Sequence, residues 1–157
     1  MARDDVKVET LDDEADRVIS EARMVLPGMQ ALFGFQLIAV FSERFADALP
    51  SPLQWLHLAA IVLVALAVAL IMTPAAWHRQ AEPGLVTRRF VVLTSTLLTS
   101  AMAPLGLGIA LDVFIVAWMI VGSTLASAAI AFFCAAVIFG LWFVFPRYRS
   151  RPRKPSH

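Results

Sequence analysis

The side chains that could do chemistry in this chain are few, and most lie within or beside long apolar runs. In the first run, Arg23, Gln30 and Gly34 fall on one helical face, whereas Gln36 lies on another. A polar side chain in an apolar helix is costly unless it lines an internal pathway or hydrogen-bonds to a neighbouring helix. Both interpretations stay open for Gln30, and the hydrogen bond between helices is favoured because side-chain amides commonly form it.

A second candidate site is the pair His57 and Asp112, which come from different apolar runs. Asp112 is the only acid between Glu82 and the C-terminus, and both members of the pair are expected at the same membrane surface. An imidazole beside a carboxylate can relay protons. The same side chains more often make a structural contact or face water, so the pairing is a hypothesis.

Charged residues flank the apolar runs. Glu21 precedes the first run and is expected to pair with Arg88 or Arg89 of a neighbouring helix, or to lie free at the interface. His78 and Arg79 follow the second run, where cations oppose the helix dipole without any further role.

No motif of an enzyme, a nucleotide-binding protein or a zinc site occurs in the sequence. Cys134 is the single cysteine, which excludes an intrachain disulfide. His57 and His78 are expected at opposite membrane surfaces and so cannot share a metal. We therefore expect a protein that is not an enzyme and has no cofactor. The basic tail is short and lacks interleaved aromatic residues, so nucleic acid is not expected as a partner.

The elements that carry these residues must be membrane helices. The residues are 59% hydrophobic and only 16% charged, against about a quarter charged in soluble domains. The first segment is acidic and polar, unlike a signal peptide. Four spans are expected at residues 24–41, 53–73, 91–111 and 124–145, with the third helix extending to residue 121. The last turn lies either at residues 104–108 or at Gly122-Ser123, and the second place is preferred because it gives a balanced fourth span.

A short amphipathic helix is expected before the first span, starting with a capping box at Thr10–Asp13 and meeting the span near Pro27-Gly28. Residues 10–147 then form one transmembrane domain between a mobile N-terminus at 1–9 and a basic tail at 148–157. All Lys and Arg residues except Arg44 fall in the N-terminal segment, the second loop and the tail. The positive-inside rule therefore places both termini in the cytoplasm. The expected fold is an all-α integral membrane four-helix bundle.

Two further sets of residues are predicted to make contacts with helices or lipid. Small residues at four-residue spacing in the last two spans are expected to let those spans pack face to face: Ser95, Thr99 and Ala103 in one, and Ser123, Ser127, Ala131 and Ala135 in the other. Bases at the C-terminal end are expected to bind anionic lipid headgroups: Arg147, Arg149, Arg151, Arg153 and Lys154.

Several short segments carry a family resemblance: Glu21-Ala22-Arg23, Gly28-Met29-Gln30, Phe33, Arg44-Phe45, residues 74–79, Trp142 and Pro146. In this order and spacing, over about residues 17–147, the chain resembles a family of small four-span bacterial membrane proteins of unknown function. The resemblance implies a bacterial cytoplasmic membrane and directs attention to Glu21, Arg23, Gln30, His78 and Arg79.

The hypothesis favoured by these patterns is a non-enzymatic protein that acts by helix assembly with its own copies or with a membrane partner. The alternative is a small oligomeric transporter or channel in which Gln30 and Arg23 line the path.

Overall fold

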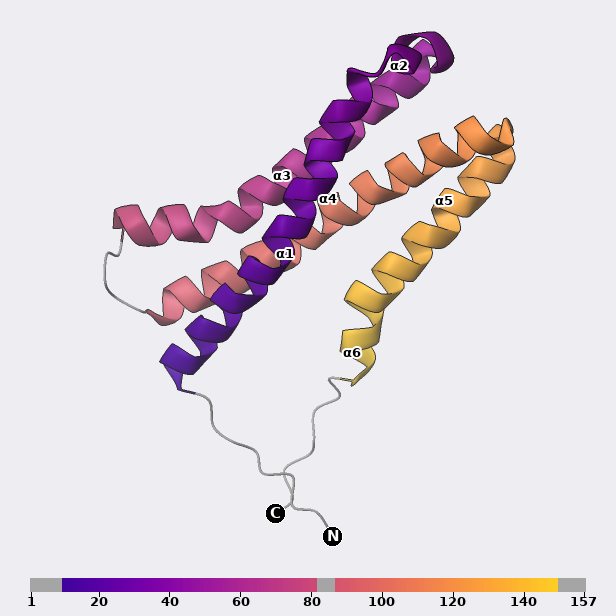
Figure 1. Cartoon of the computed structure of the whole chain (residues 1–157). Helices are drawn as coiled ribbons and strands as arrows, with labels where there is room; N and C mark the ends of the chain where they lie inside the picture. Colours follow the sequence, from indigo (N-terminus) through magenta and orange to yellow (C-terminus); the bar gives the residue numbers. More distant parts are fainter. Residues whose placement is uncertain (1–9, 82–86, 150–157) are drawn as a thin grey trace.

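The computed structural model describes residues 10–81 and 87–149, and this part of the chain is helical. The helices are α1 (Leu11–Val40), α2 (Glu43–Ala48), α3 (Ser51–Ala81), α4 (Arg88–Val121), α5 (Thr124–Phe139), the π-helix η1 (Gly140–Val144) and α6 (Phe145–Arg149). The described part of the chain has four long helical spans, and successive spans run in opposite directions (Figure 1). The start of α1, the end of α3, the start of α4 and α6 lie at one end of the bundle, called here the terminal end. The α2 helix and the α4–α5 turn lie at the opposite end, called here the loop end.

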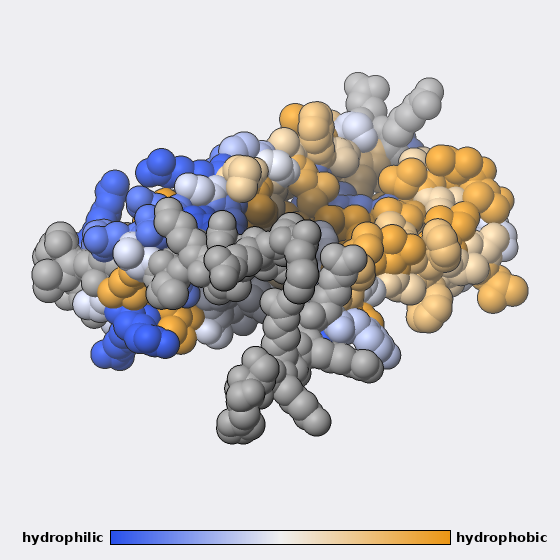
Figure 2. All heavy atoms as spheres, turned by 90° about the horizontal axis from the view of Figure 1, so that it is seen from below, coloured by the Kyte–Doolittle hydropathy of each residue, from blue (hydrophilic) through white to orange (hydrophobic). Residues whose placement is uncertain are grey.

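Four of the helical rods are long and apolar enough to cross a membrane: Leu11–Val40, Ser51–Gln80, Arg88–Val121 and Thr124–Tyr148. Their outer surfaces carry large apolar side chains such as Phe35, Phe132 and Phe133, each more than two thirds exposed. Seen from the terminal end, the side of the molecule where α5 lies is covered by hydrophobic residues (Figure 2). The predicted all-α, four-span membrane fold is therefore confirmed.

The core lies where α1, α3 and α4 cross. Met29 of α1 packs with Val64 and Ile71 of α3 and with Leu105 of α4. The α3 and α4 backbones approach each other closely at Gly108, because a Cβ atom there would lie 2.9 Å from Cγ2 of Val64. In contrast, α5 leaves α4 progressively toward the terminal end (Figure 1), and little of it is buried.

The first helix is continuous through Pro27. The amphipathic segment predicted ahead of the first span is thus the start of α1 itself rather than a separate helix. The capping box at its start is present, with the Asp13 backbone N–H donating to Thr10 Oγ1 over 3.2 Å. Hydrogen bonds from Thr10 lower the pKa of the Asp13 carboxyl. The charged residues of α1 all precede Met24, so its membrane-spanning part begins there.

The turn between the last two spans lies at Gly122-Ser123, the preferred one of the two places considered. Gly122 has φ +69°, a left-handed conformation that favours glycine, and it ends α4. The other place considered, residues 104–108, is an uninterrupted part of α4. The predicted mobile N-terminus and the tail bases Arg151, Arg153 and Lys154 lie outside the described residues, as does the side chain of Arg149. Arg147 is exposed in the middle of α6.

Candidate functional site

A buried polar cluster joins α1, α3 and α4 near the loop end. The Gln36 side chain donates from Nε2 to Oδ2 of Asp112 over 2.7 Å. Nδ1 of His57 lies 3.5 Å from Oδ1 of the same carboxyl group. The other ring nitrogen of His57 lies 3.0 Å from the backbone oxygen of Gln36. Each of the three residues therefore contacts the other two.

Most of the cluster is shielded from its surroundings, although the Asp112 side chain is 21% exposed. Gln36 is 4% exposed and His57 is 7% exposed, and the ring of Phe45 packs against the imidazole with centroids 5.3 Å apart. The three polar residues form part of the wall of a cavity of about 240 Å³ whose other walls are mainly apolar. Polar groups buried in this way are stabilising only when they are paired, so the cluster fixes the register of three helices.

The contacts of His57 define where its protons lie. A backbone oxygen can only accept, so Nε2 of His57 carries the proton that it donates to Gln36. Nδ1 then faces a carboxyl oxygen, and these two atoms attract each other only if one of them carries a second proton. A hydrogen bond between these two atoms would therefore need one shared proton, in either an imidazolium–carboxylate pair or a neutral imidazole beside a carboxylic acid. Both forms have zero net charge, which suits a site inside a membrane.

The predicted contact between His57 and Asp112 is present in this cluster, whereas Gln36 was not predicted. Gln36 lies seven residues after Met29, whose side chain is also buried, so the two share the inward face of α1. The seven-residue spacing between Met29 and Gln36 is the sequence feature from which the inward direction of Gln36 could have been suspected. The Oε1 atom of Gln36 is buried and has no hydrogen-bond partner among the described residues.

A second site lies near the terminal end, where α1, α3 and α4 enclose a partly open cavity of about 340 Å³. Arg23 of α1 and His78 and Arg79 of α3 all line it. Three of the five polar candidates, separated by more than fifty residues of sequence, thus come together around one space. The floor of the cavity is apolar and includes Ile71 and Phe90. The His78 ring lies 5.2 Å from the ring of Phe90.

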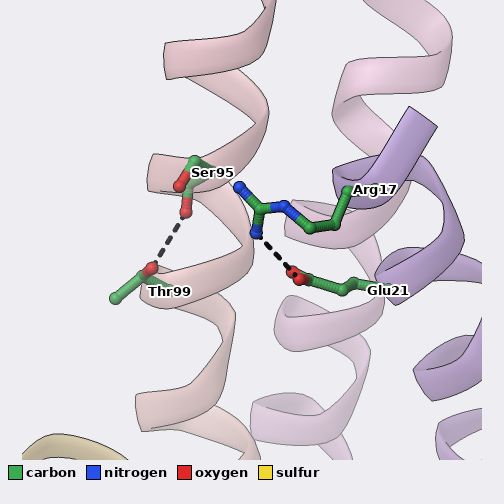
Figure 3. A network of polar contacts seen from close by, with 4 residues as sticks. All are labelled: Arg17, Glu21, Ser95 and Thr99. Carbon is green, nitrogen blue, oxygen red and sulfur yellow. Dashed lines mark hydrogen bonds and ion pairs between the residues drawn. The ribbon is translucent and has the colours of Figure 1, made fainter. Parts of the chain in front are cut away.

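Glu21 faces another way. It pairs with Arg17, one turn earlier in α1, with 3.3 Å between Nη1 and Oε1 (Figure 3). The expected partners are engaged differently or lie apart: the guanidinium of Arg89 lies over the Trp77 ring, 5.5 Å from its centroid, and Arg88 is exposed. The expected pairing with Arg88 or Arg89 is therefore wrong, because the helical (i, i+4) spacing offers Glu21 a nearer cation.

Comparison with known proteins adds a family but no activity. Residues 4–146 match the model of a family of unknown function, DUF6328. The chain belongs to this family. No curated protein and no solved structure matches the sequence of this DUF6328 protein. Any function must therefore be inferred from the arrangement of the side chains.

The predicted packing of two small-residue stripes is only partly realised in the DUF6328 protein. On α5, Ser127 is fully buried and Ala131 is 9% exposed, as expected. On α4, Ser95 and Thr99 are exposed, and the Thr99 hydroxyl donates to the Ser95 backbone oxygen over 2.9 Å (Figure 3). The prediction is wrong for these two residues because α5 diverges from this part of α4. Ala103 and Ala135 are half-buried, and Ser123 caps the start of α5.

The remaining candidate, Gln30, points away from the bundle and is exposed, as is Arg23. Among the described residues it makes no hydrogen bond, in contrast to Gln36 six residues later. Among the described residues, no group of three His, Cys, Asp or Glu side chains is placed to hold a metal ion. The structure thus separates the polar residues into a buried cluster, a cationic cavity and an outward amide.

Proposed function

We propose that this DUF6328 protein is a non-enzymatic membrane protein that works as an assembly of its own copies, joined through the outward face of α1. The observation that carries the proposal is Gln30, an exposed amide that lies seven residues inside the apolar part of α1. An amide facing hydrocarbon leaves its donors and acceptor without partners, which costs free energy that a neighbouring helix can recover.

A second copy of the chain is the partner that fits this amide most simply. A glutamine side chain both donates and accepts, so two glutamines can pair with each other. In a twofold dimer with its axis along the membrane normal, Gln30 of one copy meets Gln30 of the other at the same depth. The contact then satisfies both side chains without any further polar residue.

The glycine on the same face supports this assignment. Gly34 lies one turn after Gln30, and a Cβ atom added to it would meet nothing within 4 Å in the chain's own structure. Glycine weakens a helix by about 0.5–1 kcal/mol relative to alanine, and packing within the chain does not require it here. Between two copies, a glycine lets helix backbones approach closely.

We also propose that the terminal end faces the cytoplasm of a bacterial cell. The support is the concentration of Lys and Arg in the segments at that end, together with the single Arg44 at the other. Anionic headgroups of the inner leaflet are then the expected partners of the basic tail. Labelling of single cysteines at positions 44 and 79 with a membrane-impermeant maleimide in intact cells tests this orientation. Labelling of position 79 alone would overturn it.

Crosslinking tests the assembly. In a Cys134→Ala background, Gln30→Cys and Gly34→Cys should form disulfide-linked dimers in liposomes. Phe133→Cys, on the exposed face of α5, is the control for random collision. Separately, Gln30→Leu should weaken dimerisation by about tenfold, which corresponds to about 1.4 kcal/mol. Equal crosslinking at positions 30 and 133, together with an unchanged dimer fraction in Gln30→Leu, would refute the proposal.

A small oligomeric transporter or channel is the second candidate. The observation that favours it is the alignment of Arg23 and Gln30, both exposed and two turns apart on one face of α1. A ring of copies would place these residues around a central path. Flux of protons or cations into liposomes, lost in Gln30→Ala, is the result expected of this candidate. Absence of flux in a sample that crosslinks through position 30 would leave assembly as the function.

A further inference from the structure

We propose that the cavity between α1, α3 and α4 at the terminal end binds an anionic phospholipid, with the lipid phosphate held by Arg23, His78 and Arg79. The cavity has a volume of about 340 Å³, which lies at the small end of the range for ligand sites. Its size suits the phosphate and the first part of one acyl chain. The proposal does not depend on self-assembly.

Charge is the first argument. Arg23 and Arg79 line the cavity from α1 and α3, and no acidic residue is among those that line it. The nearest acid along α1, Glu21, belongs to a separate cavity and is paired with Arg17. The site therefore presents at least two positive charges to whatever enters it. Guanidinium groups bind phosphate with two parallel hydrogen bonds, which makes phosphate a better fit than a single carboxylate.

The second argument is an unused ring nitrogen. Nδ1 of His78 is shielded from solvent and has no hydrogen-bond partner among the described residues. The ring packs against Phe90, with centroids 5.2 Å apart, and His78 is one of the residues that line the cavity. A buried polar atom without a partner is unfavourable, because it has lost its hydrogen bonds to water without replacing them. A phosphate oxygen or a headgroup hydroxyl in the cavity would pair with this nitrogen.

The third argument is the apolar floor, which identifies the source of the phosphate. Farther from the terminal end than the cations, the cavity is lined by apolar side chains that include Leu26, Ile71 and Met72. A free phosphate ion would leave this surface empty, whereas an acyl chain would cover it. Arg23 directly precedes the apolar part of α1, and Arg79 lies near the end of α3. The cations therefore lie at the depth of the headgroups, with the apolar floor toward the bilayer interior.

Native mass spectrometry of the full-length protein in detergent tests the site. The probes are phosphatidylglycerol, phosphatidylcholine and inorganic phosphate, each added alone and in competition. We expect preferential binding of phosphatidylglycerol that inorganic phosphate at millimolar concentration does not displace. Arg23→Gln and Arg79→Gln should each weaken binding about fivefold, since each base near the headgroups contributes about 1 kcal/mol. The double variant should weaken it by about 25-fold.

Matched variants separate this site from surface charge in general. Arg88→Gln removes an exposed cation at the same end but outside the cavity, and it should bind phosphatidylglycerol as the unmodified chain does. His78→Phe keeps the ring against Phe90 and removes the nitrogen, and it should weaken lipid binding while leaving the thermal unfolding temperature unchanged or raised. Wild-type binding by the double Arg variant, equal weakening by Arg88→Gln, or full displacement by inorganic phosphate would each overturn the proposal.

Discussion

The contacts that Asp112 makes with Gln36 and His57 can be tested by comparing two replacements of the acid. In Asp112→Asn, the amide oxygen can accept the hydrogen bond from Gln36, and the amide nitrogen can donate to Nδ1 of His57. Every contact made by the carboxyl group then has an equivalent that needs no shared proton. We expect Asp112→Asn to change the free energy of unfolding by no more than about 0.5 kcal/mol. This is as small as the effect of most surface substitutions.

Asp112→Ala removes both contacts at once. The Gln36 amide loses the acceptor at 2.7 Å, and Nδ1 of His57 loses its partner at 3.5 Å. A buried group without a partner costs about 1–3 kcal/mol in a soluble protein, whereas hydrogen bonds between membrane helices average about 0.6 kcal/mol and reach about 1.7. Because the His57 contact is long, most of the loss comes from the amide. We therefore expect a destabilisation of about 2 kcal/mol.

Unfolding in mixed micelles by increasing dodecyl sulfate, followed by circular dichroism, measures these free energies. A cycle with Gln36→Leu isolates the contact between Gln36 and Asp112, and its coupling energy should be about 1 kcal/mol. Equal destabilisation by the asparagine and alanine variants would refute the reasoning that an amide replaces both contacts of the Asp112 carboxyl group. Strictly additive losses in the cycle would show that the amide and the carboxyl group do not interact.

Three further outcomes are expected. Gly108→Ala should destabilise the protein by about 1–3 kcal/mol in the same unfolding assay, because its Cβ would lie 2.9 Å from Val64 Cγ2, and adding Val64→Ala should recover part of the loss. Gly122→Ala should cost about 1 kcal/mol because φ is +69°, whereas Gly122→Asn should cost less. Thr10→Ala should speed amide hydrogen exchange in the first turn of α1, because the Asp13 backbone N–H loses Thr10 Oγ1 as its acceptor. The lowered pKa of Asp13 means that its capping contribution is complete at neutral pH and is lost as the pH falls through that lowered pKa.

The number of spans and the last turn could be predicted from the sequence because they depend on local properties. The apolar runs have the length of a bilayer, and Gly122 is the residue type that a left-handed helix end requires. The shared depth of His57 and Asp112 could be predicted in the same way, without the facing of the two side chains. These features need no knowledge of how the helices are rotated about their axes.

The rest depends on helix rotation, which apolar periodicity determines poorly when lipid and core are both apolar. Gln30 and Gln36 are the same residue type on the same helix, and only the packing of Met29 tells which one faces inward. The gathering of Arg23 with His78 and Arg79 likewise follows from how α1 crosses α3. Ser95 and Thr99 do not contact α5 because α5 diverges from this part of α4. None of the small residues on α4 predicts that divergence.

The length of α4 has a consequence for the membrane around it. Its 34 residues rise about 51 Å, against a hydrocarbon layer of about 30 Å. Such a mismatch is relieved by tilting the helix, kinking it or thickening the lipid nearby. Pro104 lies inside α4 and offers a place for the kink. Because α4 is pressed against α3 at Gly108, a change in its tilt carries α3 with it. We therefore expect the acyl-chain length of the surrounding lipid to influence the angle at which these two helices cross.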